Sequence, residues 1–293
     1  MAASSGSARR SLIRGAACCA ALLLAACASA PPQTPAVRYA LETASAPIVQ
    51  RIHVLELDLD RVRLETTPGD RSGGREYRAR LTSDFAAVFG YDAAVNGGYF
   101  TPFRGGSPGG EDYYPHVGDA VDVSGAAIAF GREASPIEAS ADERVNAILC
   151  IKGVRVAIVD GQSCGDDVDH ALAAGPRLLA DGAVRDVAPF GAAYASARHP
   201  RTALGLDRRA RKAWLVVVDG RQEGFSDGAS LPELTAILQS LGAADAINLD
   251  GGGSTTLVLQ RDGAVTVVNS PIHTGVPGRE RPVANHLGVR VAP

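Results

Sequence analysis

Aromatic residues are scarce in this chain of 293 residues: they make up 5% of it, against 33 glycines and 17 prolines. This balance argues against a helical bundle and is typical of a turn-rich fold that contains β-structure. Apolar residues form 46% of the chain and charged residues 21%. A sizeable hydrophobic core can therefore form, which excludes an intrinsically disordered chain.

The mature chain also lacks an excess of positive charge. Arg9, Arg10 and Arg14 precede an apolar stretch over 15–26 that is too short for a permanent membrane span, a pattern typical of an export signal. From Cys27 onward the chain has 26 basic and 32 acidic residues, a net charge of −6. Such a surface repels polyphosphate backbones, so no nucleic-acid partner is expected.

The end of this signal resembles the bacterial lipobox, in which a cysteine is diacylated and becomes the mature N-terminus. The segment Leu24-Ala25-Ala26-Cys27 predicts a lipoprotein signal peptide over 1–26, a flexible tether over 27–45 and a folded domain over 46–293. Ala28, in place of Asp, favours the outer membrane and its periplasmic side, with membrane contact through the lipid anchor only. The alternative is ordinary cleavage after Ala28-Ser29-Ala30.

Only two cysteines, Cys150 and Cys164, remain in the body of the chain. No Cys-x-x-Cys or His-x-x-x-His spacing supports a zinc site. In an oxidising compartment two such cysteines can pair, so a disulfide is predicted. Two free thiols or half of a metal site are the alternatives.

The hydrophobic pattern predicts a single mixed α/β domain of the α+β type, β-rich, with a central β-sheet and few helices. The runs 52–59 and 61–65 predict an early hairpin. One helix is expected over about 84–89, capped by Thr82 or Ser83. A second begins at Ser230, which has capping-box spacing to Glu233, and ends before Gly242.

A first glycine-centred segment reads Asn96-Gly97-Gly98-Tyr99 at the end of an apolar run. Glycines there let the backbone approach a ligand without a Cβ in the way. Asn96 is then expected to present its amide to a polar ligand, and Tyr99 or Phe100 to present a flat face. An ordinary Asn-Gly hairpin turn is the alternative.

A second segment has a buried strand that ends in Asp250, followed by Gly251-Gly252-Gly253 and the hydroxyl residues Ser254 and Thr255. Consecutive backbone N–H groups in such a loop form a nest that holds phosphate oxygens, and Ser254 and Thr255 add donors. The loop is neither a Walker motif, since no lysine follows the glycines, nor a Gly-x-Ser-x-Gly nucleophile elbow. Asp250 is predicted to be functional, with turn capping as the alternative.

A third segment places Asp219 and Arg221 after another buried strand. The helix from Ser230 lies between this strand and the one that ends at Asp250. A strand, helix and strand of this length favour a parallel crossover, which puts both strand ends on one edge of the sheet. Asp219, Asp250 and Arg221 are therefore expected to share a cleft, an assembly suited to glycosidic cleavage.

Several short motifs together resemble the phosphodiester glycosidase family, whose typical member removes N-acetylglucosamine from mannose-6-phosphate diesters. They follow the family's order over about 200 residues, and the Asp250 motif is the distinctive one. They are Asn96 to Phe100, Gly175 to Leu178 with Asp181-Gly182, Arg201 to Gly205, Asp219 to Arg221, Asn248 to Thr256 and Arg281 to Asn285. The resemblance implies a mixed α/β hydrolase that cuts between a sugar anomeric carbon and a phosphate, with Asn285 at the site.

The expected chemistry follows from the leaving group. A phosphate monoester leaves readily, so the site must bind phosphate and stabilise an oxocarbenium-like centre. Asp250 or Asp219 is expected to stabilise that charge or activate water, and Arg201 and Arg221 to hold the phosphate of a glycan or sugar-phosphate substrate. A surface ion pair is the alternative for each arginine. His199 is expected to be exposed and idle, and a role as a base is the alternative.

Two other functions stay open. A non-catalytic envelope lipoprotein that binds polysaccharide would use the same loops without needing both carboxylates. A metal-assisted phosphodiesterase would place a divalent cation between Asp219 and Asp250 and break the P–O bond. Otherwise no cofactor is expected. The irregular segment 101–119 is interpreted as a lid, and a solvated face is the alternative for its acidic residues.

We predict that metabolic labelling with a fatty-acid analogue marks the wild-type protein but not Cys27→Ser, because only the cysteine thiol accepts the acyl chain. Gel fluorescence and N-terminal mass spectrometry report the result. An unlabelled wild type whose mature chain starts near Pro31 would exclude the anchor and leave export intact.

Overall fold

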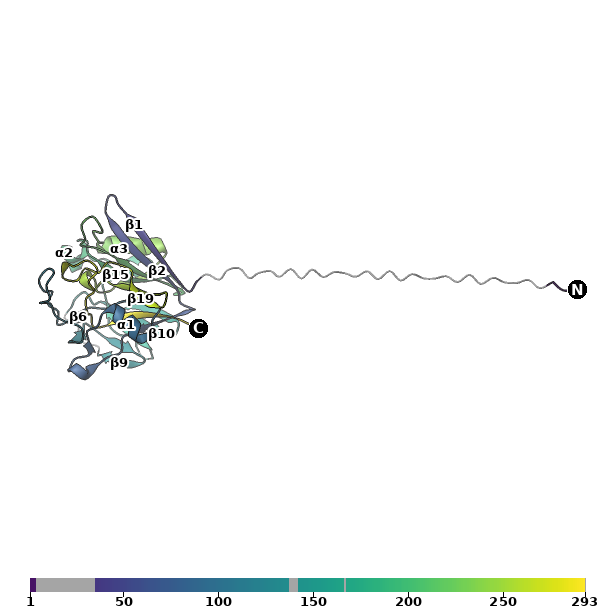
Figure 1. Cartoon of the computed structure of the whole chain (residues 1–293), viewed down its shortest axis with the longest axis horizontal. Coiled ribbons are helices and arrows are strands. Elements are labelled where there is room, and N and C mark those ends of the chain that lie inside the picture. The colour runs from purple at the N-terminus through teal and green to yellow at the C-terminus, as the bar shows by residue number, and fades with distance from the viewer. Residues whose placement is uncertain (4–34, 137–141, 166, 293) are drawn as a thin grey trace. The chain divides into compact units, whose positions relative to one another are not determined.

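The computed structural model describes residues 1–3, 35–136, 142–165 and 167–292, so Cys27 and most of the export signal lie outside the described residues. Strand β1 (Val37–Ala44) pairs with β2 (Gln50–Asp58) along its whole length. The folded domain therefore begins near Pro35, and the tether predicted over 27–45 is too long (Figure 1).

The central element is an antiparallel sheet of seven strands. It runs in the order β1, β2, β16 (Lys212–Val218), β15 (Arg201–Leu206), β17 (Asp245–Asn248), β13 (Arg177–Ala180) and β14 (Ala183–Val184). The β-rich α+β fold predicted from the sequence is confirmed.

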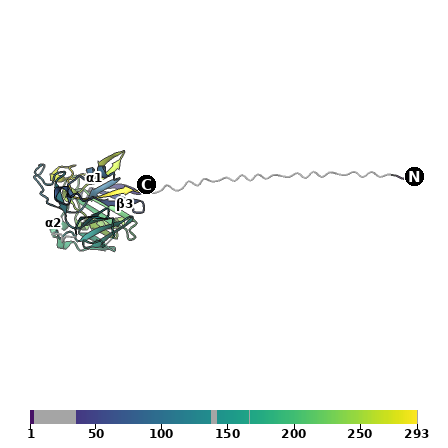
Figure 2. The same ribbon diagram turned by 90° about the horizontal axis from the view of Figure 1, so that it is seen from below.

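Three smaller antiparallel sheets complete the strands of the described residues. One contains β11 (Arg155–Asp160), β10 (Ala147–Lys152), β12 (His170–Ala174), β8 (Ala127–Ala129) and β9 (Arg132–Ser135). The next contains β19 (Ala264–Val267), β18 (Leu257–Arg261), β5 (Ala93–Asn96), β20 (His286–Val291) and β3 (Val62–Thr66), with β20 and β3 side by side near the C-terminus (Figure 2). The last contains β4 (Tyr77–Arg78), β7 (Ala120–Val123) and β6 (Phe100–Thr101).

The predicted early hairpin is wrong. β2 pairs with β1 and β16, whereas β3 pairs with β20 in a different sheet. Both runs are apolar at alternate positions because each contributes to the core between the sheets, where Leu55, Leu57 and Leu64 are buried together. Alternation marks a strand with one buried face but does not identify its neighbour.

The described residues contain three α-helices: α1 (Thr82–Phe89), α2 (Ala192–Ala195) and α3 (Leu231–Leu241). Ser230 and Glu233 form the predicted capping box of α3, and Gly242 ends the helix in the left-handed conformation. α1 starts earlier than expected: its N-cap is Leu81, so Thr82 and Ser83 form the first turn instead of capping it. Four short 3-10 turns are η1 (Arg71–Gly73), η2 (Ala188–Phe190), η3 (Gly252–Ser254) and η4 (His273–Gly275).

Both faces of the seven-stranded sheet are covered. Leu231, Leu234 and Leu238 of α3 pack on one face, and side chains of the two five-stranded sheets pack on the other. β16 and β17 both pair antiparallel with β15 between them, so they are parallel to each other. The predicted crossover through α3 is confirmed, and it brings the ends of β16 and β17 to one edge.

Cys150 in β10 and Cys164 form a disulfide, with Cα atoms 5.7 Å apart, as predicted. Disulfides persist in oxidising compartments, so the bond fits the predicted export. None of the described helices is long and apolar enough to cross a bilayer.

We expect the double variant Cys150→Ala/Cys164→Ala to lose about 3 kcal/mol of unfolding free energy, because the disulfide closes a short loop in the unfolded chain. For a domain of this size the melting temperature falls by about 10 °C. Calorimetry with and without reductant measures the shift, and reductant should not affect the variant. Quantitative alkylation of both cysteines in the unreduced wild type would contradict the bond.

Candidate active site

A pocket of about 270 Å³ opens at the edge of the seven-stranded sheet where three strand ends meet. Arg201, the first residue of β15, pairs with Val218, the last residue of β16, and Ala203 pairs with Asn248 at the end of β17. Most of the residues that line the pocket belong to the loops that adjoin these strand ends. The lining residues are Tyr99, Phe100, Phe103, Arg144, Tyr194, His199, Arg201, Arg221, Asp250, Gly251, Gly252, Gly253 and Arg281.

Asp250 is the only carboxylate among the described residues that line the pocket. Its Oδ1 accepts a hydrogen bond from the N–H of Gly251 at 2.8 Å, and its Oδ2 accepts one from the Ser254 hydroxyl at 2.7 Å. Burial raises the pKa of Asp250, although Arg281, these two donors and Arg144 oppose the rise. A fixed carboxylate with a raised pKa in a pocket is typical of a functional acid, base or nucleophile.

The glycine loop lies against two guanidinium groups. A Cβ on Gly252 would come within 3.1 Å of Arg221 Nη1, and one on Gly253 would collide with the Arg281 guanidinium. Gly252 also has a φ of +62°, a conformation that side chains rarely adopt. Glycine is therefore required here so that both arginines can reach the pocket.

Arg144 and Arg201 are each fixed by the protein through one side of the guanidinium. Arg144 donates through Nε and Nη2 to Asp142, and its Cζ lies 4.0 Å from the centroid of the Tyr99 ring. Arg201, 2% exposed, donates through Nε to the Ala229 carbonyl at 3.1 Å and through Nη2 to the Tyr194 carbonyl. In neither case does Nη1 bond to another of the described residues.

Arg221 and Arg281 are fixed by neutral partners. Arg221 Nη2 donates to His199 Nδ1 at 3.1 Å. Arg281 donates through Nε to His273 Nδ1 at 3.2 Å and through Nη1 to Ser254 Oγ at 3.1 Å. Arg221 Nη1 and Arg281 Nη2 form no hydrogen bond within the described part of the chain. Four arginines thus present pre-positioned donors to one small cavity.

His199 lines the pocket and is half-buried, so it is not the exposed residue that was expected. Its Nε2 lies 2.9 Å from the Ala193 carbonyl, and its Nδ1 accepts from Arg221, which places the ring proton on Nε2. Burial, together with Arg221 and Arg201, lowers the pKa of His199. A neutral imidazole is therefore the form that supports Arg221.

Two tyrosines form one side of the pocket. The hydroxyls of Tyr99 and Tyr194 share a short hydrogen bond, and Asn248 Nδ2 lies 3.1 Å from each of them. The Tyr99 hydroxyl also donates to the Gly175 carbonyl at 2.7 Å. Burial raises the pKa of both phenols, so they stay neutral.

Several residues predicted to touch the ligand lie behind the pocket wall. Asn96 is fully buried and braces the site: its Nδ2 donates to the Asp250 carbonyl at 2.7 Å, and its Oδ1 accepts from the Thr202 hydroxyl at 2.8 Å. Asn285 accepts from the N–H groups of Gly97, through its carbonyl at 2.8 Å, and of Gly98, through its side chain at 3.0 Å. These residues shape the wall instead of lining it.

The hydroxyl residues after the glycines are also buried. Ser254 supports Asp250 and accepts from Arg281, so it joins the two charges. Thr255 is 1% exposed and does not belong to the lining. Neither side chain provides the direct phosphate donor expected from the sequence.

Asp219 does not line the pocket either, so the expected cleft with two carboxylates is not formed. Its side chain is 1% exposed, and its Oδ2 lies 3.0 Å from Nε2 of His53 in β2. The strand edge was predicted correctly, but the Asp219 side chain points to the interior beside β2.

Arg144, Tyr194, Phe103 and Arg281 are lining residues that sequence reasoning missed. Arg281 stands in the closing motif of the family resemblance, and that position was the available signal. Arg144 and Tyr194 come from connections with no glycine motif, and Phe103 from the irregular segment 101–119. No group of three or more His, Cys, Asp or Glu residues suited to a metal occurs in the described ranges.

The fold is shared with solved structures at low sequence identity. The catalytic domain of zebrafish N-acetylglucosamine-1-phosphodiester alpha-N-acetylglucosaminidase, auto-inhibited by its pro-peptide, matches at 20% identity and a TM-score of 0.62, covering 89% of this chain and 85% of that one. A Burkholderia pseudomallei protein named as exported matches at 18% identity and 0.60, covering 85% and 75%. A hypothetical protein from Synechocystis matches at 18% and 0.50, covering 87% and 61%.

No curated protein matches the chain in sequence. The model of the phosphodiester glycosidase family, by contrast, matches residues 89–290, which is well over half of the 293 residues. The match spans the strand ends and the glycine loop that form the pocket. The chain belongs to the phosphodiester glycosidase family.

Proposed function

We propose that this pocket hydrolyses the bond between a sugar anomeric carbon and a phosphate in a sugar-1-phosphodiester. The observation that carries the proposal is one carboxylate of raised pKa facing four guanidinium groups in a single pocket. Each guanidinium keeps a nitrogen that bonds to no other of the described residues. Guanidinium groups bind phosphate oxygens through charge-assisted hydrogen bonds. The carboxylate repels phosphate, so Asp250 does not improve phosphate binding, and its presence favours a catalytic role over a purely binding one.

The arginines hold the phosphate and take up the charge that develops on it as the bond breaks. Because their guanidinium groups are already fixed by the protein, little reorganisation is needed during the reaction. The leaving phosphate has a second pKa of about 6, so it departs without a strong general acid. Glycosidases usually need two carboxylates, and here the arginines replace the acid.

Asp250 serves the sugar side of the bond. Its carboxylate is fixed by Gly251 and Ser254 and stabilises positive charge at the anomeric carbon or activates the attacking water. Tyr99, Tyr194 and Phe103 also line the pocket, and each has a guanidinium group over a face of its ring. A cavity of about 270 Å³ is near the small end of the range for ligand sites, roughly 300–1,000 Å³, which suits one terminal sugar and its phosphate.

The substrate is proposed to be a glycan or sugar phosphate of the cell envelope or its surroundings, with the enzyme tethered through Cys27 to the outer membrane on its periplasmic side. The disulfide supports an oxidising compartment, and a structurally similar protein is named as exported. The metal-assisted alternative needed Asp219 beside Asp250, and Asp219 is bonded to His53 instead.

We expect Asp250→Asn to lower kcat and kcat/KM together by at least ~100-fold, about 2.7 kcal/mol of barrier, with little change in KM or melting temperature. Because the raised pKa belongs to a group that must be ionised, wild-type kcat/KM should fall with acid at a midpoint above the ordinary value of about 4. Residual activity of the variant should lack this acid limb. Steady-state kinetics across pH on a verified sugar-1-phosphodiester measure both effects.

The matched control is Asp262→Asn, the same change at an exposed residue of the β18–β19 turn that does not line the pocket. It should behave as the wild type. If Asp250→Asn keeps near-wild-type turnover, the catalytic assignment is wrong, and if it fails to fold, Asp250 caps the glycine loop instead.

Hydrolysis in ¹⁸O-labelled water should place the label on the sugar product, because the proposed cleavage breaks the C–O bond. Treatment with EDTA should leave the rate unchanged. Mass spectrometry of both products reads the position of the label. Label in the phosphate, or activity that is lost with EDTA and restored by a divalent cation, would favour a phosphodiesterase.

A further inference from the structure

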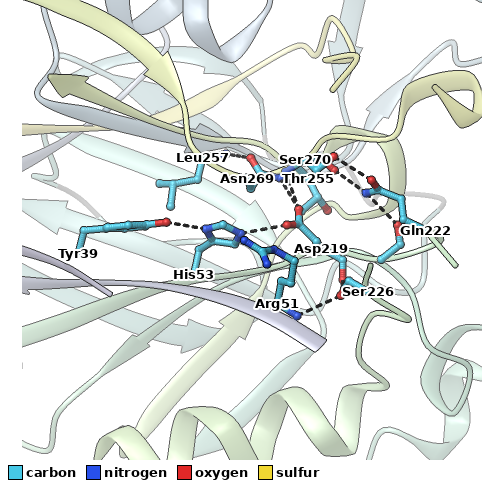
Figure 3. Close-up of polar contacts among 11 residues, drawn as sticks. Tyr39, Arg51, His53, Asp219, Gln222, Ser226, Thr255, Leu257, Asn269 and Ser270 are labelled. Atoms are coloured by element: carbon cyan, nitrogen blue, oxygen red, sulfur yellow. Dashed lines mark hydrogen bonds and ion pairs between the residues drawn. The ribbon is translucent and has the colours of Figure 1, made fainter. Parts of the chain in front are cut away.

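Asp219 lies outside the pocket lining but only two residues from Arg221, at the centre of a buried polar network (Figure 3). Its Oδ2 lies 3.0 Å from His53 Nε2. Its Oδ1 accepts hydrogen bonds from the Ser270 N–H at 2.8 Å and from Asn269 Nδ2 at 3.0 Å. A buried carboxylate costs free energy unless every acceptor position is used in this way.

The network ends on the buried His53 and on Tyr39. Because Asp219 is an acceptor, His53 donates its Nε2 proton, and its Nδ1 lies 2.9 Å from the Tyr39 hydroxyl, which can act as donor or acceptor. Both ring nitrogens of His53 are therefore satisfied. The same chain of bonds forms with the opposite tautomer if the group facing Nε2 becomes a donor.

Asp219 and Gln222, which lie on either side of Arg221 in the sequence, both form hydrogen bonds with Ser270. The Asp219 carboxylate binds the Ser270 N–H, and the Gln222 side chain accepts from the Ser270 hydroxyl and donates to the Ser270 carbonyl, both at 2.8 Å. The Asp219 carbonyl also accepts from the Ser226 hydroxyl at 2.6 Å. We call the bonds of Asp219 and Gln222 to Ser270 the clamp. Arg221 itself takes no part in it, and its side chain enters the pocket.

Arg221 has a φ of +58°, the left-handed conformation that is unfavourable for residues other than glycine. Such a conformation persists only where the surroundings impose it. The bonds of Asp219 and Gln222 to Ser270, together with the hydrogen-bonded turn from Gln222 to Ser226, hold the chain on both sides of it. The guanidinium is then aimed at His199 and the cavity.

The same network reaches the loop that carries Asp250. Asn269 Nδ2 donates to the Thr255 carbonyl at 3.1 Å as well as to Asp219, and its Oδ1 accepts from the Leu257 N–H at 2.8 Å. The far end of the glycine loop and the Arg221 turn are therefore held to one another through Asp219.

We propose that Asp219 is a positioning residue, which sets Arg221 in place to bind the substrate phosphate and takes no part in bond cleavage. The inference rests on the proposed function in one respect, that Arg221 binds phosphate. It assigns to Asp219 a role that needs its hydrogen-bond acceptors and not its negative charge.

The test compares Asp219→Ala with Asp219→Asn. The alanine variant loses the clamp and should weaken binding of inorganic phosphate, measured by calorimetry, and raise KM by about 10-fold or more, with a smaller change in kcat. The asparagine variant keeps both bonds to Ser270 and Asn269 through its Oδ1 and donates to His53 after the tautomer change, so it should stay within about 3-fold of the wild type. Loss of turnover in Asp219→Asn with phosphate affinity retained would show that the carboxylate is catalytic and overturn the proposal.

A double-mutant cycle isolates the route through Arg221. In an Arg221→Gln background, Asp219→Ala should weaken phosphate binding by less than about 2-fold more, because the side chain it positions is already gone. Additive losses would overturn the proposal.

Gln222→Ala tests the other half of the clamp if Asp219→Ala does not fold, and unchanged phosphate affinity in this variant would contradict the clamp. Glu223→Gln, an exposed neighbour outside the lining, is the control.

A crystal structure separates this proposal from the proposed function. Even if the wild type binds no phosphate and cleaves no sugar-1-phosphodiester, Arg221 should move away from His199 in Asp219→Ala, or in Gln222→Ala, and keep its place in Asp219→Asn. An unmoved Arg221 in the folded alanine variants would overturn the positioning role by itself.

Discussion

The pocket concentrates like charges, and their mutual repulsion is the constraint on which the surrounding structure depends. Arg144, Arg201, Arg221 and Arg281 line one cavity that contains a single carboxylate among the described residues. Burial lowers the pKa of Arg281 to about 10, Asp250 opposes the change and Arg221 adds to it. Guanidinium groups in such a place must be fixed by the protein, or they would turn away from one another toward solvent.

Most of the supports are neutral. Arg201 is held by carbonyl oxygens, Arg221 by His199, and Arg281 by His273 and Ser254. Burial and the neighbouring Arg281 and Arg279 lower the pKa of His273 to about 4, so it remains an uncharged acceptor at physiological pH. Neutral acceptors fix a guanidinium without neutralising it, which leaves its charge available to an anion.

The sequence predicted the strands and the helix that carry the site better than it predicted the side chains that line the pocket. The apolar runs and the capping box located β16, α3 and β17, and the crossover rule brought Asp250 and Arg221 to one edge. Which side chains line the cavity depends on rotation about the backbone and on long-range partners. Asp219 and Asn96 turn inward because His53 and Thr202, distant in sequence, complete their hydrogen bonds. Arg144 enters the pocket because Asp142 and the Tyr99 ring hold its guanidinium there.

The irregular segment 101–119, which the sequence suggested as a lid, contacts Arg281 and the residues around it. Its Gly110 carbonyl accepts from Arg279 at 2.9 Å, and its Tyr113 ring lies edge-on to His273 with centroids 4.3 Å apart. The Phe103 ring lies under the Arg281 guanidinium, 4.2 Å from Cζ. This segment therefore forms a wall of the pocket in the described structure. Because it contacts Arg281 and His273 rather than Asp250, its sequence can alter how the phosphate side is enclosed without moving the carboxylate.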